Sequence, residues 1–252
     1  MKFTKMEALG NDFIVLEETA PSPETIQKLC DRRRGIGADG LLAVDPFPTM
    51  RYWNADGRPA EMCGNGLRCV ARYAVERGWA PAGEWFTVVT PVGERRALVD
   101  GDRITVEVGP VTIGGMLTVG ERVFHEASVG NPHAVTLVDD PTRVDVPLEG
   151  PEVAADPAFL NGTNVEYVQV VSPGHIRMRV WERGVGETLA CGSGMVAAVA
   201  VAVGQSADPV RVRVPGGEGT VVFEGGSAYL TGPAVKVFEG EWIGVTAPDG
   251  AR

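Results

Sequence analysis

Two cysteines stand in nearly the same local sequence in the two halves of the chain. Cys63 opens the motif Cys-Gly-Asn-Gly, Cys191 opens Cys-Gly-Ser-Gly, and a largely apolar segment follows each motif. Such a segment after a Gly-x-Gly turn predicts a helix, which places each thiol at a helix N-terminus. Free backbone N–H groups and the helix dipole there favour a thiolate. Each half of the protein is therefore expected to present one thiol.

Polar residues at matching positions indicate an internal duplication. Asn54 lies nine residues before the first of these cysteines, and Glu182 lies nine residues before the second. Asn11 and Asn131 are 120 residues apart, against 128 for the two cysteines. A nearly constant offset is the mark of a repeated unit.

The repeated cysteine discriminates among the chemistries that a thiol can perform. If the glycines serve only a tight turn, the cysteines are small buried hydrophobic residues. A redox dithiol usually has its two cysteines close in sequence. A cysteine-nucleophile hydrolase with His133 as its base needs no second, equivalent thiol. Proton transfer at two faces of one carbon uses both, because a thiolate removes a proton while the opposing thiol supplies one.

Composition excludes several other classes of function. The chain has 252 residues, enough for two modest domains or one large one, and a net charge of −10. No basic cluster exceeds the arginine triplet at 32–34, so we expect no nucleic-acid partner. The longest apolar run, 195–203, is too short to cross a bilayer, and residues 1–10 contain no apolar secretory segment. We therefore expect a cytoplasmic protein with no membrane partner.

The remaining cysteines are interpreted as structural. Four cysteines without a Cys-x-x-Cys pair, and three dispersed histidines, argue against a zinc site, and thiols stay reduced in the cytosol. Cys30 and Cys69 fall on the apolar faces of expected helices, so both are predicted to pack in the core.

The pattern elsewhere predicts many short strands and few helices. Ser22 and Pro23 provide an N-cap and a first-turn proline for one helix, and each cysteine motif begins another. Strands are expected at residues 2–9, 13–16, 41–44, 51–53, 86–90, 94–99, 103–108, 123–129 and 134–138, from 163, at 176–181, and from 210 to about 245.

Six motifs together give the chain a clear resemblance to the diaminopimelate epimerases. They are L-G-N-D-F (9–13), N-A-D-G (54–57), C-G-N-G-x-R-C (63–69), G-N-P-H (130–133), T-N-V (163–165) and E-R-G-x-G-E-T-x-A-C-G-S-G (182–194), in the family's order over nearly the whole chain. The resemblance implies an α+β fold of two pseudo-symmetric domains, each a curled, mostly antiparallel β-sheet around a central helix, with the site between them. It implies a pyridoxal-independent enzyme that interconverts LL- and meso-2,6-diaminopimelate in lysine biosynthesis, with no cofactor or metal, and a homodimer. We expect an N-terminal domain at 1–111, joined by residues 243–252, and a C-terminal domain at 112–242.

The resemblance also implies a role for each matching residue. Cys63 and Cys191 are the acid/base pair, with His133 and Glu182 beside the reacting centre. The reacting carboxylate is held by backbone N–H groups of Gly64, Asn65, Gly192 and Ser193, and helix N-termini are suitable anion sites on physical grounds as well. The substrate's distal end is held by Asn54, Asn131, Asn164 and Arg183, and Asn11 also lines the site.

Some positions depart from the family pattern, and three other classes stay open. Gly40 stands where some members have Gln, so one side-chain contact is absent, while Leu67 and Met195 replace commonly small residues. Proline racemase-type enzymes share the two-cysteine logic but usually have His where Asn65 stands. A phenazine-type isomerase lacks the cysteine pair, and a non-catalytic amino-acid binder needs no thiols.

Overall fold

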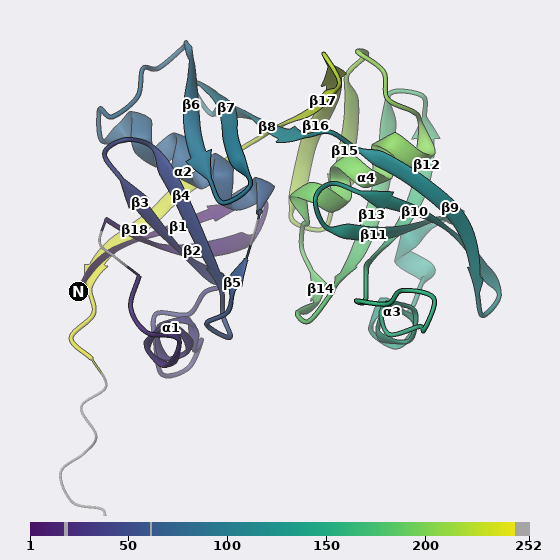
Figure 1. The fold of residues 1–252 in the computed structure, drawn as a ribbon, viewed down its shortest axis with the longest axis horizontal. Coiled ribbons are helices and arrows are strands. Elements are labelled where there is room, and N and C mark those ends of the chain that lie inside the picture. Colours follow the sequence, from purple (N-terminus) through teal and green to yellow (C-terminus); the bar gives the residue numbers. More distant parts are fainter. Residues whose placement is uncertain (18–19, 61, 245–252) are drawn as a thin grey trace, which may run out of the picture.

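The strands form two lobes, each curled around one central helix (Figure 1). The structure is a computed structural model that describes residues 1–17, 20–60 and 62–244. The α+β fold of two similar halves, expected from the resemblance, is confirmed. In the described part of the chain, no helix is long and apolar enough to cross a membrane.

The elements follow the same order in both halves. The first half contains β1 (Lys2–Ala8), β2 (Asn11–Leu16), α1 (Pro23–Cys30), β3 (Gly40–Asp45), β4 (Thr49–Asn54), β5 (Pro59–Ala60), α2 (Gly64–Glu76), β6 (Trp85–Thr90), β7 (Gly93–Asp100) and β8 (Arg103–Gly109). The second contains β9 (Thr112–Val119), β10 (Arg122–Ser128), β11 (Pro132–Leu137), the 3₁₀ turn η1 (Pro141–Arg143), α3 (Val146–Ala154), β12 (Asn164–Ser172), β13 (His175–Glu182), β14 (Gly186–Thr188), α4 (Gly192–Ala202), β15 (Val210–Val214), β16 (Gly217–Glu224), β17 (Ser227–Gly232) and β18 (Val235–Glu241).

The strand pairings repeat as well as the order. The parallel pair β2–β3 corresponds to β11–β12, and the parallel pair β4–β6 corresponds to β13–β15. The antiparallel hairpins β3–β4 and β12–β13 each deliver the chain to the short strand that precedes a cysteine. The predicted duplication is thus present in three dimensions.

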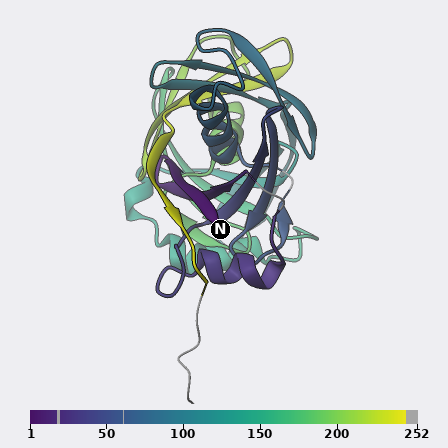
Figure 2. The same ribbon diagram turned by 90° about the vertical axis from the view of Figure 1, so that its left-hand side faces the viewer.

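The two halves are joined by β8 and β17, and the strand that follows each of these pairs with the first strand of the other lobe. β8 pairs with β17 and joins the two sheets, after which β9 pairs with β10. In the same way β18 leaves β17 and pairs with β1, beside which it runs in Figure 2. The return to the N-terminal lobe therefore begins at residue 235, earlier than the 243 expected, because this strand completes the N-terminal sheet. Residues 245–252 lie outside the described residues.

The two central helices are buried by their lobes. In α4 every residue from 192 to 200 is buried, as a helix without charges requires. In α2, Cys69 is fully buried, and Cys30 is buried at the end of α1, so the packing predicted for both is confirmed.

The helix α3 was not expected from the sequence. Its segment contains Pro147, Gly150 and Pro151, which disfavour a helix interior. Asp145 caps it by accepting a hydrogen bond from the N–H of Leu148 (3.3 Å). Gly150 is needed because a Cβ there would lie 2.6 Å from the Trp181 side chain.

Candidate active site

Both cysteines are the N-cap residues of the central helices, as the sequence predicts. The sulfur of Cys63 accepts a hydrogen bond from the N–H of Gly66 (3.3 Å) at the start of α2. The sulfur of Cys191 accepts the equivalent bond from the N–H of Gly194 (3.4 Å) at the start of α4. Each thiol thus lies in the first turn of a helix, on the surface where the lobes face each other.

The N-termini of these helices touch. A Cβ built on Gly192 would lie 3.1 Å from the Cα of Gly64 and 3.2 Å from the backbone nitrogen of Asn65. A larger residue at this contact would push the helices apart. Two sets of free N–H groups therefore meet at one place, which makes an anion site.

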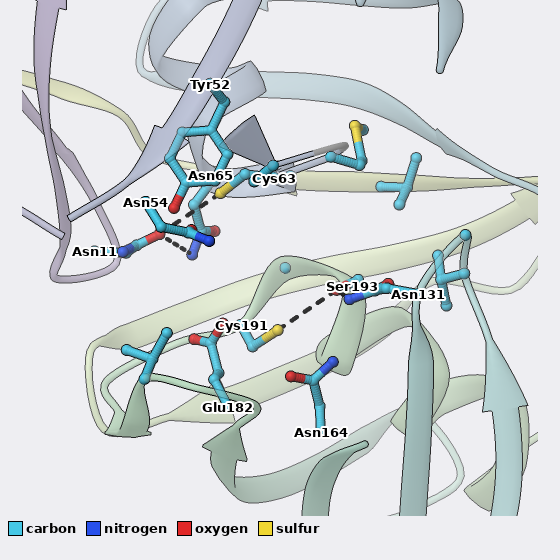
Figure 3. A pocket seen from close by; sticks show the side chains of 18 of the residues that line it. Asn11, Tyr52, Asn54, Cys63, Asn65, Asn131, Asn164, Glu182, Cys191 and Ser193 are labelled. Atoms are coloured by element: carbon cyan, nitrogen blue, oxygen red, sulfur yellow. Dashed lines mark hydrogen bonds between the residues drawn. The ribbon is translucent and has the colours of Figure 1, made fainter. Parts of the chain in front are cut away.

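A cavity of about 400 Å³ lies over this contact, between the lobes. Figure 3 shows side chains of the N-terminal lobe on one wall, Cys63 among them, and side chains of the C-terminal lobe, with Cys191, on the other. The candidate residues that line it are Asn11, Asn54, Cys63, Gly64, Asn65, Asn131, Asn164, Glu182, Arg183, Cys191, Gly192 and Ser193.

His133 does not line this cavity, although we expected it beside the reacting centre. It is 1% exposed. Its Nε2 lies 3.1 Å from Oδ1 of Asn131, and its Nδ1 lies 2.7 Å from Oε1 of the buried Glu166. In turn Nδ2 of Asn131 donates to Oγ of Ser193 (3.2 Å), 3.5 Å from the sulfur of Cys191. His133 is thus placed to act on the cysteine only through intervening side chains.

The surroundings of Cys63 differ from those of Cys191. The Cys63 thiol donates to Oδ1 of Asn11 (3.8 Å), and Nδ2 of Asn65 donates to the same oxygen (3.4 Å). Asn65 is held by the fully buried Arg68, whose Nη2 donates to its Oδ1 (2.7 Å). Arg68 also donates to the carbonyl of Pro233 (3.2 Å), in the connection that returns the chain from β17 to β18.

Burial outweighs the helix N-terminus in setting the pKa of the thiols. It raises the pKa of Cys63 to about 12, although the N–H of Gly66 acts in the opposite direction. It also raises the pKa of Cys191 well above its usual value, with the carboxylates of Glu182 and Glu166 adding to the effect. The N–H groups at the helix start therefore favour a thiolate, as expected, but burial of the thiols in this cleft has the larger effect on their pKa. Burial also raises the pKa of Glu182 to about 7, so this carboxyl can hold or release a proton near neutrality.

Polar groups at the far end of the cavity fix one another. Oδ1 of Asn164 accepts from the backbone N–H of Arg183 (2.9 Å), and its Nδ2 donates to the carbonyl of Pro132 (2.9 Å). The guanidinium of Arg183 is exposed and donates to the carbonyl of Asn161 (2.9 Å). This end therefore offers an amide and a mobile cation to a ligand that extends from the cysteines.

Several residues of the site were not singled out from the sequence. Glu166 is a lone charge in a buried strand, which is a signal that could have marked it. Arg68 lies within the first cysteine motif, but the sequence gives no sign that this arginine is buried. The others are Asp39 and Tyr52, which line the cavity, and Thr188, which donates a hydrogen bond to Glu182. The described residues contain no group of three or more His, Cys, Asp or Glu that could hold a metal ion.

The fold occurs in solved structures that share little sequence with this chain. A predicted epimerase from Pseudomonas aeruginosa matches 97% of the chain and 99% of its own length with a TM-score of 0.73 at 14% identity. A probable proline racemase from Agrobacterium radiobacter matches 98% of the chain and 93% of its own length, also at 0.73, with 16% identity. These likenesses place the chain in the class of two-lobed proteins that share this fold. In this chain a thiol from each lobe lies at the shared cleft.

The sequence comparisons narrow this class to one family. The family model for diaminopimelate epimerase matches residues 3–114 and 126–237. The diaminopimelate epimerase of Desulforudis audaxviator is 42% identical over 96% of this chain and 99% of its own length. That of Carboxydothermus hydrogenoformans is 40% identical over 96% and 100%. The chain belongs to the diaminopimelate epimerase family.

Proposed function

We propose that this protein interconverts LL- and meso-2,6-diaminopimelate by proton transfer between two cysteines, without pyridoxal or another cofactor. The observation that carries the proposal is the pair of N-cap thiols on opposite walls of one cavity, above helix N-termini in contact. Family membership supports the substrate. Lysine biosynthesis is the pathway that this substrate implies.

The helix N-termini suit the carboxylate next to the reacting carbon. Backbone N–H groups at Gly64, Asn65, Gly192 and Ser193 lie at the lining of the cavity and carry the positive ends of two helix dipoles. As the α-proton leaves, negative charge moves onto the carboxylate, so these groups stabilise the transition state more than the ground state. The carbon attached to that carboxylate would lie between the two sulfurs.

The raised pKa values of the thiols determine which step each cysteine performs readily. A buried thiol holds its proton firmly, which suits the partner that must supply one. The opposing cysteine must lose its proton before it can act as the base, and Glu182 is the acceptor with a pKa near neutrality. We assign Glu182 to that role, and His133 to holding Asn131 and Ser193 in place beside Cys191.

The second amino-acid head of the substrate would lie at the far end of the cavity. Asn54, Asn131 and Asn164 offer amide groups there, and Arg183 offers a guanidinium that can bind a carboxylate with two parallel hydrogen bonds. A substrate with one head would offer no carboxylate to the Arg183 guanidinium and no second polar head to the amides. This distal set therefore favours diaminopimelate over proline-sized substrates.

Isotope incorporation from heavy water tests the two-thiol scheme. The proton removed by one cysteine and the deuteron supplied by the other must differ, so early meso product should carry deuterium at the inverted carbon while unreacted LL-substrate carries very little. Cys63→Ala and Cys191→Ala should each abolish epimerisation. Equal early deuteration of substrate and product, or substantial activity in either variant, contradicts the scheme. Exchange of L-proline but not of LL-diaminopimelate would instead identify a proline racemase-type enzyme.

We further propose that the protein is a cytoplasmic homodimer. Apolar side chains on one stretch of β18 support a partner surface, since Val235, Val237 and Phe238 are about half exposed. Light scattering on the purified protein should give twice the mass of the chain. A monomer at micromolar concentration would contradict this part of the proposal.

A further inference from the structure

Asp39 lies immediately before β3 and lines the cavity on the wall that carries Cys63. None of the roles proposed above involves it. One carboxylate oxygen, Oδ2, accepts from Nδ2 of Asn11 (2.6 Å) and from the backbone N–H of Asp12 (3.1 Å). The other, Oδ1, accepts from the guanidinium of Arg32 (2.6 Å). Its backbone N–H donates to Asp12 as well. The side chain is therefore held from three sides.

These contacts determine which end of the Asn11 amide faces the cysteine. A carboxylate paired with an arginine can only accept hydrogen bonds, so the NH₂ group of Asn11 must point toward Asp39. Its carbonyl oxygen then points the other way, where the Cys63 thiol and the amide of Asn65 both donate to it. Figure 3 shows Asn11 to one side of Asn65 and Cys63, with its oxygen toward both.

We propose that Asp39 is the positioning residue for the first thiol: it fixes Asn11 so that the amide oxygen, and not the amide nitrogen, faces Cys63. An oxygen acceptor keeps the proton on the sulfur and aims the S–H bond, whereas an N–H donor at the same place would stabilise a thiolate. The effect on turnover rests on the proposed function, with Cys63 taken as the thiol that supplies a proton to the LL-substrate. The orientation itself does not.

The C-terminal lobe has a different arrangement, so the orientation is not a by-product of the duplication. Asn131, the counterpart of Asn11, directs its Nδ2 toward Oγ of Ser193 on the side of Cys191. Its Oδ1 faces His133, whereas the corresponding end of the Asn11 amide is an NH₂ group that donates to the Asp39 carboxylate. The two lobes thus present opposite ends of equivalent amides toward their cysteines. In the N-terminal lobe Asp39 makes the shorter bond that selects the end (2.6 Å to Nδ2 of Asn11), and the weaker bond from Asn65 to the Asn11 oxygen (3.4 Å) acts in the same direction.

The first measurement is the rate at which iodoacetamide alkylates each cysteine, followed by peptide mass mapping. Asp39→Asn keeps the shape of the side chain but supplies an N–H donor, so Asn11 can turn its NH₂ group to the sulfur. Alkylation of Cys63 should become about three to ten times faster, the value of one hydrogen bond, while Cys191 is unchanged. An unchanged rate at Cys63 would overturn the proposal. The charged groups nearest this sulfur, Glu182 and Arg68, are the same in both proteins.

The second measurement is a double-mutant cycle on kcat/KM for LL-diaminopimelate. Asp39→Asn should lower it by about three- to ten-fold in the wild-type background and by less than about two-fold in Asn11→Ala, because Asp39 acts only through that amide. An equal loss in both backgrounds would show a merely structural role and overturn the inference. Arg32→Gln is the matched control: it removes the same ion pair but leaves the bond to Asn11, and should change kcat/KM and alkylation by less than about two-fold.

The two proposals fail in different ways. A wild-type protein that does not turn over LL-diaminopimelate, but shows the expected alkylation pattern, would refute the proposed function and leave the positioning role supported. A fully active wild type in which Asp39→Asn changes neither readout would refute the positioning role alone.

Discussion

Adding one methyl group at Gly192 tests whether contact between the helix N-termini sets the geometry of the site. Its Cβ would lie 3.1 Å from the Cα of Gly64, 3.2 Å from the nitrogen of Asn65 and 3.3 Å from Leu230. All three are closer than ordinary carbon contacts of about 3.5–4.0 Å, so the helices must separate by a few tenths of an ångström. The matched control is Gly64→Ala, whose Cβ would lie 3.5 Å from its nearest neighbours and needs no such shift.

The expected effects differ in size and in kind. A misplacement of 1 Å can cost about a hundred-fold in rate, so a shift of a few tenths predicts about a five- to ten-fold fall in kcat/KM for Gly192→Ala. Overpacking costs about 1–3 kcal/mol in stability, while replacing glycine by alanine in a helix favours folding by about 1 kcal/mol. We therefore expect a slightly lowered melting temperature for Gly192→Ala and an unchanged or raised one for Gly64→Ala.

Steady-state epimerisation and thermal unfolding of the two variants check this directly. Gly64→Ala should keep kcat/KM within about two-fold of wild type, because no atom at the contact must move. If Gly192→Ala is as active as wild type, the close contact does not control the spacing of the thiols. If the two variants lose activity equally, the loss does not arise from the shorter Cβ distances at Gly192 than at Gly64.

Three other perturbations follow from the site. The folded-state pKa of Glu182, about 7 against 4.5 for an ordinary glutamate, means that the folded protein holds this proton more tightly, so stability should fall as pH rises from 4.5 to 7. Glu182→Gln should flatten that decline in urea unfolding, and an unchanged pH dependence would contradict the assignment. Arg183→Lys should raise KM about ten-fold or more with less effect on kcat, since lysine cannot form the paired hydrogen bonds; an unaltered KM argues against a carboxylate there. Mild oxidants should inactivate the enzyme reversibly by joining Cys63 to Cys191, and mass mapping that finds both thiols free in the inactive protein excludes this.

The features that could be predicted from sequence are those encoded locally. Both N-cap cysteines follow from a Cys-Gly-x-Gly motif before an apolar run, and the duplication follows from regular spacing. The packing of Cys30 and Cys69 follows from helical periodicity. The N-cap and packing predictions depend on residues within about one helix length, where sequence patterns determine conformation, and the duplication depends only on comparing two stretches of the sequence.

Features that depend on distant pairing could not be predicted in this way. β18 pairs with β1, which is separated from it by almost the whole chain. The sequence of residues 235–241 does not indicate which strand they pair with. The position of His133 behind Asn131 depends on the register of β11 against β12, which brings Glu166 beneath it. The pKa of each thiol likewise depends on burial by elements from both halves, which outweighs the local helix N-terminus.

The cysteines have equivalent positions in the two halves, but the buried side chains next to each cysteine motif differ. β2 pairs with β3 as β11 pairs with β12, so Phe13 occupies in one lobe the place of His133 in the other. Leu42 and Glu166 correspond in the same way, so an apolar contact in the N-terminal lobe is replaced by a buried hydrogen bond in the C-terminal lobe. Proton transfer at opposite faces of one carbon requires equivalent thiols, which the duplication provides. The remainder of the substrate extends from that carbon in one direction only. Side chains that differ between the two lobes can determine this direction.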